Sequence, residues 1–119
     1  MSDVTKLNDE LNAAILNGTA MDAFEKLYAD DVVMQENETP PTVGKDANRK
    51  REIEFFGSVA EWHSGALLGT AVNGDRSYAE LEAELTFKNG HRTKMIQVAV
   101  RQWKDGKIVH EKFYYNGGH

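Results

Sequence analysis

Acidic side chains stand where one strand of this 119-residue chain should finish. The segment 27–41, LYADDVVMQENETPP, begins with apolar residues and then places the polar run QENE before a proline pair. A carboxylate at such a strand end can face a cavity, where partial burial raises its pKa and suits it to abstract a proton next to a carbonyl. We therefore take Glu36 as the first candidate catalytic residue; the alternative is a solvated strand end.

A second acid, Glu111, lies within the strand-like run IVHEKFYY. Side chains alternate along a strand, so Glu111 shares a face with Phe113 and Tyr115 and is expected to point inward. Two carboxylates close together raise one of the two pKa values, which gives an acid and a base. Glu111 is thus the second candidate catalytic residue. The alternative is a position at an open rim, where it reaches water or pairs with a basic residue of a helix.

Three helices are predicted before the sheet. Apolar residues at helical spacing favour a first helix that ends at the Asn-Gly pair 17–18 and a second that follows Thr19, the expected cap. A short strand over DDVVMQE follows, and the prolines exclude a helix or a central strand in NETPPTVG. A third helix is predicted over 46–56, with Ile53 and Phe56 facing inward.

The second half of the chain is predicted to form an antiparallel sheet. The dipeptides Asn89-Gly90 and Asp105-Gly106 are strong hairpin signals, because both central residues of a two-residue turn need positive φ. Loops of two residues fix the register, and the register decides the face to which each side chain points.

One face of this predicted sheet is apolar and the other is mixed. With two-residue loops Leu81 pairs with Val98 and Val98 pairs with Phe113, which places all three toward the helices. The apolar face also holds Trp62, Ala66, Leu68, Ala83, Ile96, Val100 and Tyr115. The mixed face holds Tyr78, Arg101, Trp103, His110 and Tyr114, together with Met95 and Gln97. Its aromatic enrichment favours a homodimer joined through this outer face; the alternative is a solvated sheet surface.

These elements predict an α+β fold, a cone-shaped barrel in which about three N-terminal helices pack on a curved, mostly antiparallel sheet. The length indicates one domain spanning 1–119. Incomplete closure of the cone leaves an apolar cavity as the candidate binding site for a small apolar molecule. Its expected substrate-binding residues are Asn12, Tyr28, Trp62, Phe113 and Tyr115. Core packing is the alternative for the aromatic residues, and a cap on neighbouring backbone is the alternative for the asparagine.

Composition argues against several other classes of protein. A net charge of −5 without an uncompensated basic face argues against nucleic acid as a partner. The absence of cysteine excludes disulfides and thiolate chemistry, and the four histidines show no ligand spacing, so no metal and no cofactor are expected. No apolar run approaches the length of a membrane span, and the charged N-terminal segment lacks a signal core. A cytoplasmic protein is expected.

Three segments resemble the SnoaL-like polyketide cyclase group of the nuclear transport factor 2-like superfamily: LNGTAMDAFEKLYADDVV, GKDANRKREIEFF and VAVRQWKDGKIVHEKFYY. That superfamily also contains ketosteroid isomerases, limonene epoxide hydrolases and scytalone dehydratases. The resemblance covers nearly the whole chain, and it implies an α+β cone that commonly forms a homodimer through its sheet.

Catalytic residues carry over from this superfamily only selectively. The resemblance implies that the proton-shuttling carboxylate of the isomerases falls on Glu36, with Glu38 as the alternative. Their tyrosine falls on Asn12 and their protonated aspartate on the Ala-Val pair 99–100, so neither acid donor is present. The Asp-Arg-Asp network of the hydrolases lacks a match, because Arg101 is expected to face outward.

These observations together predict a small-molecule enzyme of the SnoaL-like type. It would bind an apolar, carbonyl-bearing compound and transfer a proton without metal or cofactor, as an isomerase, cyclase or dehydratase. Glu36 would act as the base, while Glu111, Asn12 and Tyr115 would orient or polarise the ligand. The alternative is a non-catalytic ligand-binding or dimerisation module of the same fold.

Overall fold

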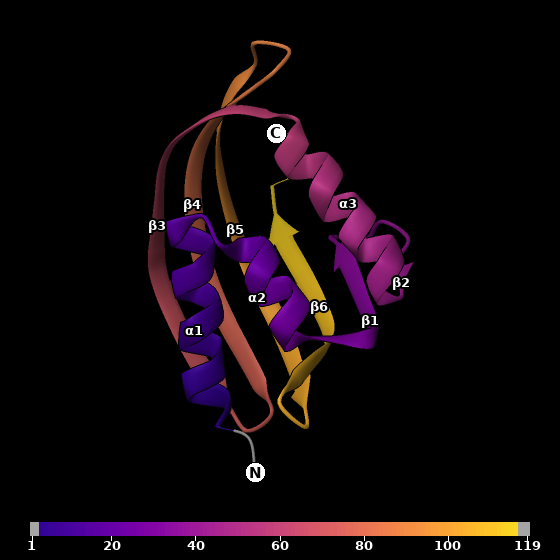
Figure 1. The fold of residues 1–119 in the computed structure, drawn as a ribbon. Coiled ribbons are helices and arrows are strands. Elements are labelled where there is room, and N and C mark those ends of the chain that lie inside the picture. The colour runs from indigo at the N-terminus through magenta and orange to yellow at the C-terminus, as the bar shows by residue number, and fades with distance from the viewer. Residues whose placement is uncertain (1–2, 117–119) are drawn as a thin grey trace.

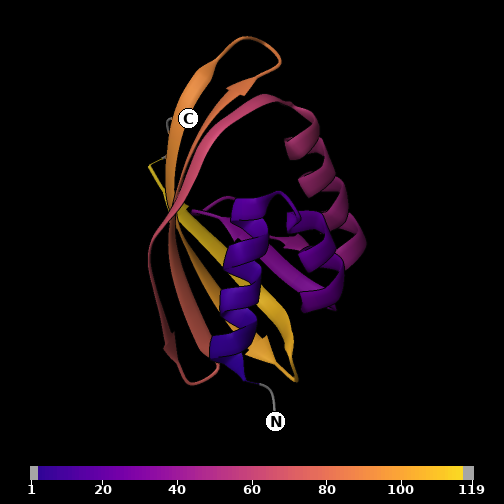
Figure 2. The same cartoon turned by 60° about the vertical axis from the view of Figure 1, so that its left-hand side comes forward.

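Within residues 3–116, which the structure describes, three helices lie on the concave side of one curved, six-stranded sheet (Figure 1, Figure 2). The structure is a computed structural model. The predicted α+β architecture is confirmed. In chain order the elements are α1 (Val4–Asn17), α2 (Ala20–Leu27), β1 (Tyr28–Glu36), β2 (Thr42–Val43), α3 (Lys45–Gly57), β3 (Val59–Asn73), β4 (Arg76–Phe87), β5 (Arg92–Lys104) and β6 (Lys107–Tyr115).

The topology of the sheet brings its first long strand beside its last. The strand order is β2-β1-β6-β5-β4-β3, in which β1 pairs with β6 in parallel and the other neighbours are antiparallel. Glu36, at the end of β1, lies opposite Phe113 of β6. The two acids selected from the sequence, Glu36 and Glu111, are therefore carried by neighbouring strands.

The first two helices supply most of the apolar core. Gly18, with φ of 87°, ends α1 as predicted, because glycine adopts this left-handed conformation without strain. Thr19 is the N-cap residue of α2, as predicted, but its hydroxyl donates to the side chain of Asn17 at 2.6 Å and forms no capping hydrogen bond. The buried core that these helices form with the sheet includes Leu11, Ala14, Ala23, Phe24, Leu27, Val32, Met34, Trp103 and Ile108.

Helix α3 turns polar residues toward the sheet and an apolar residue toward solvent. Ile53 is 56% exposed, so its predicted inward position is wrong, whereas Phe56 does line the interior. Asn48 is fully buried, and its Nδ2 donates to the carbonyls of Val32 at 3.3 Å, Thr42 at 3.0 Å and Gly44 at 2.8 Å. These bonds satisfy backbone acceptors at the edge of the sheet and set the rotation of the helix.

The β4–β5 hairpin differs from the prediction by one residue. Phe87 N donates to His91 O at 2.8 Å and Gly90 N donates to Phe87 O at 2.9 Å, so the loop holds three residues. Of the Asn-Gly pair only the glycine has positive φ, at 89°. A two-residue turn would need it at both positions.

This longer loop moves Leu81 opposite Gln97 instead of Val98, and a shift of one residue turns every side chain of β5 over. The predicted inward positions of Ile96, Val98 and Val100 are therefore wrong. The inward side chains of β5 are Met95, Gln97, Ala99, Arg101 and Trp103.

The β5–β6 hairpin forms the predicted two-residue turn. Asp105 and Gly106 have φ of 52° and 79°, and Trp103 pairs with Ile108 as expected. A bulge between Gln102 and Trp103 then shifts the register, so Glu111 pairs with Arg101 instead of Val100. Glu111 still points inward, as predicted, and the bulge gives it a basic neighbour.

Bulges also change the faces of β3. The strand has register shifts after Val59, after Trp62 and after Leu67. Trp62 pairs with inward-facing Leu85, in agreement with the prediction. Ala66 pairs with Glu82 on the outer face, and Leu68 is an exposed bulge residue, so their predicted inward positions are wrong.

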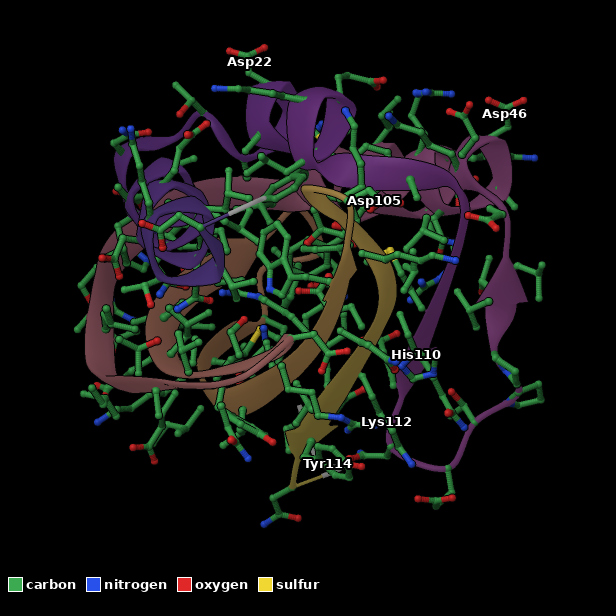
Figure 3. The ribbon with its side chains drawn as sticks, turned by 90° about the horizontal axis from the view of Figure 1, so that it is seen from below. Asp22, Asp46, Asp105, His110, Lys112 and Tyr114 are labelled. Atoms are coloured by element: carbon green, nitrogen blue, oxygen red, sulfur yellow. The ribbon has the colours of Figure 1, made fainter. Side chains whose placement is uncertain are left out.

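The outer face of the sheet lies opposite the helices. Figure 3 shows His110, Lys112 and Tyr114 projecting from β6 on the far side of the molecule from Asp22 of α2 and Asp46 of α3.

Two residues assigned to the outer face are instead buried inside. Arg101 is 0% exposed and Trp103 is 3% exposed, and the indole of Trp103 donates to Ser77 Oγ at 2.9 Å. Their assignment to a dimer face is wrong because the register of β5 differs by one residue. Within residues 3–116 no helix has the length and hydropathy of a membrane span.

Candidate active site

A cavity of about 190 Å³ lies between the helices and the concave face of the sheet. Side chains from all three helices and from five of the strands contribute to its wall. The apolar part of the wall includes Leu11, Ile15, Met21, Phe24, Phe55, Phe56, Trp62, Leu81, Leu85, Met95 and Phe113. The polar part comprises Tyr28, Glu36, Arg51, Glu52, Gln97 and Glu111. Glu82 also borders the cavity, but its side chain lies on the outer face of the sheet, where it pairs with Lys94. Polar groups thus converge on an otherwise apolar chamber, as they do in small-molecule sites.

The predicted wall residues fall into two groups. Tyr28, Trp62 and Phe113 line the cavity as predicted. Trp62 is 39% exposed and also borders a wider surface depression, so it lies where the cavity reaches the surface. Asn12 is buried but does not line the cavity. The hydroxyl of Tyr115 bonds Glu36 at the cavity wall.

Glu36 is held at the cavity wall by two partners. Its Oε2 accepts a hydrogen bond from Arg51 Nη2 at 2.6 Å, and its Oε1 accepts from the Tyr115 hydroxyl at 3.3 Å. Burial raises the pKa of Tyr115, and the nearby Glu36 carboxylate raises it further, so the phenol stays a donor.

Glu38, the alternative to Glu36, bonds Lys112 at 2.9 Å with a side chain that is 86% exposed. Glu36, and not Glu38, is therefore the acid of this pair at the cavity.

Glu111 is more deeply buried than Glu36, and both of its carboxylate oxygens accept hydrogen bonds. Its Oε2 accepts from Arg101 Nε at 3.0 Å and its Oε1 accepts from the Tyr28 hydroxyl at 2.5 Å, while only 1% of the residue is exposed. Burial raises the pKa of the Tyr28 phenol well above its usual value, and the Glu111 charge adds to this. The expected alternative, an acid at an open rim, is excluded by this burial.

Arg101 organises a buried network behind Glu111. Its Nη1 donates to Asn8 Oδ1 at 2.8 Å and to Asn12 Oδ1 at 2.7 Å, and the Asn8 amide donates to Thr70 Oγ1 at 2.8 Å. Among the described residues, Arg101 Nη2 has no hydrogen-bond partner. Asn12 is thus occupied by the guanidinium and holds this network instead of a ligand.

Sequence reasoning missed Arg101 and Asn8 as parts of the site. A signal was present on the first helix, because Asn8 and Asn12 are spaced i, i+4 on the same face as Leu11. Two amides on the buried side of a helix need polar partners, and an inward arginine is such a partner. This pairing was missed because Arg101 was predicted to face outward.

Glu52 of α3 is the third carboxylate of the cavity, and sequence reasoning did not select it. It accepts no hydrogen bond and forms no ion pair with the described residues. Burial raises its pKa to about 7, the charges of Glu111 and Glu36 add to the rise, and Arg51 opposes it. A carboxyl group in this range can both hold and release a proton near neutral pH.

The cavity therefore holds three carboxylates of different character. Glu36 and Glu111 each have a guanidinium partner, whereas Glu52 has none within ion-pair distance in the described chain. Across 3–116, no three His, Cys, Asp or Glu residues gather as metal ligands.

The arrangement of helices, curved sheet and enclosed cavity defines a nuclear transport factor 2-like, or ketosteroid isomerase-like, cone fold. Within that class the chain belongs to the SnoaL-like domain family, whose model matches residues 4–115. A comparison with curated proteins found no match.

Solved structures agree with this assignment. A Mesorhizobium loti protein described as a SnoaL-like polyketide cyclase shares 30% identity, with 96% of this chain and 100% of that chain covered and a TM-score of 0.84. A Bacillus subtilis protein described as an isomerase shares 18% identity over 97% of this chain and 90% of that chain, with a TM-score of 0.78. A protein of M. tuberculosis described as an epoxide hydrolase shares 16% identity over 95% of this chain and 82% of that chain, with a TM-score of 0.76. The last two similarities are of fold alone.

Proposed function

We propose that this protein is a cofactor-independent enzyme that binds a small, apolar, carbonyl-bearing molecule and transfers a proton on it. The reaction would be an isomerisation, a cyclisation or a dehydration. The observation that carries the proposal is the Glu36 carboxylate, held by Arg51 and Tyr115 at the wall of an apolar cavity. The Mesorhizobium loti relative, described as a polyketide cyclase, supports the same class of substrate.

The roles of the residues follow from their contacts. Glu36 would take a proton from the carbon next to the carbonyl, and Arg51 and Tyr115 would keep its carboxylate in position. The C–H electron pair would form a carbon–carbon double bond, and the carbonyl π pair would move onto oxygen. Glu111 and Tyr28 would shape the polar end of the cavity, because both line it and are bonded to each other.

A non-catalytic module of the same fold is the competing proposal. It predicts a cavity that is closed, or carboxylates that point to bulk solvent. Glu36 and Glu111 instead line one chamber together with aromatic side chains, which favours an enzyme.

The decisive test is hydrogen–deuterium exchange of simple ketones. Cyclohexanone and cyclohexenone would be incubated with the protein in D2O, and loss of the α-proton signals followed by NMR. Glu36→Gln should slow protein-dependent exchange by about 100-fold or more, the usual contribution of a general base. Glu38→Gln is the matched control and should keep the wild-type rate. Full exchange by Glu36→Gln would refute the role of Glu36.

We also propose that two copies of the chain associate through the outer face of the sheet. Arg101 and Trp103 are not part of this interface, because both are buried inside the protein. Tyr114 and Ile96 are exposed on that face, which also carries Tyr78 and His110. Replacement of Tyr114 by Asp should lower the sedimentation coefficient from that of a dimer to that of a monomer, because it places a charge in an apolar contact. A monomeric wild-type protein would contradict this.

A further inference from the structure

The rotation of α3 about its axis places Glu52 at the cavity wall and leaves apolar Ile53 exposed to solvent. At the start of the helix Asn48 bonds three backbone carbonyls, and near its end Phe55 packs edge-on against Phe87 at 6.2 Å. A rotation that buried Ile53 would break these contacts. The helix therefore exposes Ile53 and keeps Glu52 at the cavity wall, an inversion of the usual helical pattern that marks functional sites.

Glu52 also differs from its neighbours in having spare hydrogen-bonding capacity. Glu36 is bonded by a guanidinium and a phenol, and Glu111 is bonded by another guanidinium and another phenol. Glu52 forms none of these contacts with the described residues. A half-buried polar group without a partner lacks the stabilisation that a hydrogen bond gives, and a ligand in the cavity can supply it.

The charged groups around Glu52 favour its neutral form. From β1 and β6 it meets the carboxylates of Glu36 and Glu111, and on its own helix it meets Arg51, which is already paired at 2.6 Å with Glu36. Arg101 of β5 forms its ion pair with Glu111 and not with Glu52. Glu82 of β4 is paired with Lys94 at 3.1 Å.

The helices α1 and α2 present apolar side chains to the same chamber, including Leu11, Met21 and Phe24. Burial and the neighbouring carboxylates together raise the pKa of Glu52 to about 7.

We propose that Glu52 is a second catalytic residue of this cavity: a neutral carboxyl group that donates its hydrogen bond to the carbonyl oxygen of the ligand. The inference deepens the proposed function and rests on it. The ligand class is a neutral ketone or enone, because an anionic ligand would meet Glu36 and Glu111 as well.

The proton balance of the step is simple. Glu36 accepts the α-proton and becomes neutral, while the electron pair of the broken C–H bond forms the carbon–carbon double bond. The carbonyl π pair moves to oxygen, where the Glu52 O–H stabilises the growing negative charge or gives up its proton to form an enol. Glu36 then returns a proton to carbon, at the same or another position, and an enol returns its O–H proton to Glu52, so that both groups are restored.

The binding of a neutral ketone as a function of pH tests this inference without requiring turnover. The dissociation constant of cyclohexenone would be measured between pH 5.5 and 9 by ligand-observed NMR. For the wild-type protein it should rise above pH 7 by up to tenfold per pH unit, since ionisation removes the donor. Glu52→Gln should bind with nearly constant affinity, because an amide donates at every pH.

Two controls make the result specific. Methylcyclohexene, which has no carbonyl, should show no pH dependence with the wild-type protein. Glu54→Gln changes an exposed carboxylate two residues along the same helix, and it should retain the wild-type pH profile. A pH-independent wild-type protein, or a slope that persists in Glu52→Gln, would overturn the proposal.

A titration of 13C-labelled glutamate side chains provides a second, independent readout. One carboxyl resonance should titrate near pH 7, and that resonance should disappear in Glu52→Gln. A Glu52 resonance that titrates near pH ~4.3, the value for an exposed glutamate, would also overturn the proposal. If the binding profile holds but no ketone exchanges deuterium, the proton-transfer function fails while the donor role of Glu52 stands.

Discussion

Two carboxylate–guanidinium pairs lie at the same cavity, and they differ in how far their side chains are exposed to solvent. The Glu36–Arg51 pair has side chains that are 38% and 34% exposed, whereas the Glu111–Arg101 pair is 1% and 0% exposed. The exposed pair can exchange protons with solvent and ligand at little cost in stability. The buried pair is hydrogen-bonded to Tyr28, Asn8 and Asn12, and it stabilises the fold only while both partners are present. The proposed proton chemistry thus belongs to the more exposed pair, and structural support belongs to the buried pair.

Removal of Arg101 should have the largest effect. Arg101→Met leaves Glu111 buried without a cation, and it should lower the free energy of unfolding by about 3–5 kcal/mol. The measurement is urea denaturation followed by circular dichroism. Arg92→Met breaks the exposed pair with Glu84 and is the control, with an expected loss of less than about 1 kcal/mol. Equal losses in both variants would remove the distinction between buried and exposed pairs.

The next largest effect is expected at the phenol that serves the buried pair. Tyr28→Phe removes the hydrogen bond to Glu111 Oε1, and it should cost about 1.5–3 kcal/mol because that acceptor is charged and buried. The same denaturation measurement applies. Tyr115→Phe removes the bond to half-exposed Glu36 and should cost less; a larger loss there would contradict the comparison.

The pH dependence of stability should reveal Glu52, the cavity carboxyl group that belongs to neither pair. The folded protein holds the Glu52 proton up to about pH 7, whereas the unfolded chain releases it near its ordinary pKa. The folded state therefore binds more protons in this window, and stability falls as pH rises through it.

Glu52→Gln has no such titration, so it should be more stable than the wild-type protein at pH 8 by about 1–2 kcal/mol. The difference should be smallest near pH 4. Thermal unfolding at both pH values measures it, and a difference that does not change with pH would rule out this account.

The smallest effect on stability is expected at the exposed pair. Arg51→Gln should change the free energy of unfolding by less than about 1 kcal/mol. It should nevertheless slow deuterium exchange of cyclohexanone by about 10–100-fold, since Glu36 loses the group that orients it. A stability loss without a change in exchange would mean that Arg51 supports the fold and not the chemistry.

The sequence predicted the architecture well because the signals for it are local. Helical spacing, Gly18 and the Asp-Gly turn each specify their element through a few neighbouring residues. The placement of Glu36, Glu111 and Trp62 at the interior followed from strand position and alternation.

The faces of β5 could not be predicted because they depend on one turn. Asn-Gly fits a two-residue loop and also a three-residue loop with glycine in the left-handed conformation, and the structure adopts the second. That choice decides whether Arg101 or Val100 points inward. Likewise, the inward position of Glu52 depends on the hydrogen bonds of Asn48 to the carbonyls of Val32 and Thr42. The spacing of apolar residues along the helix does not predict these tertiary contacts.

The parallel pairing of β1 with β6 has a consequence for how the protein is made. The Tyr115–Glu36 contact joins residues 79 positions apart, and the Tyr28–Glu111 contact joins residues 83 positions apart. During synthesis the amino-terminal half leaves the ribosome without either partner, so the cavity cannot assemble until β6 emerges. Contacts between such distant residues slow folding, because a long loop must close before they form. The acids that would carry out catalysis therefore remain in water until the final strand docks.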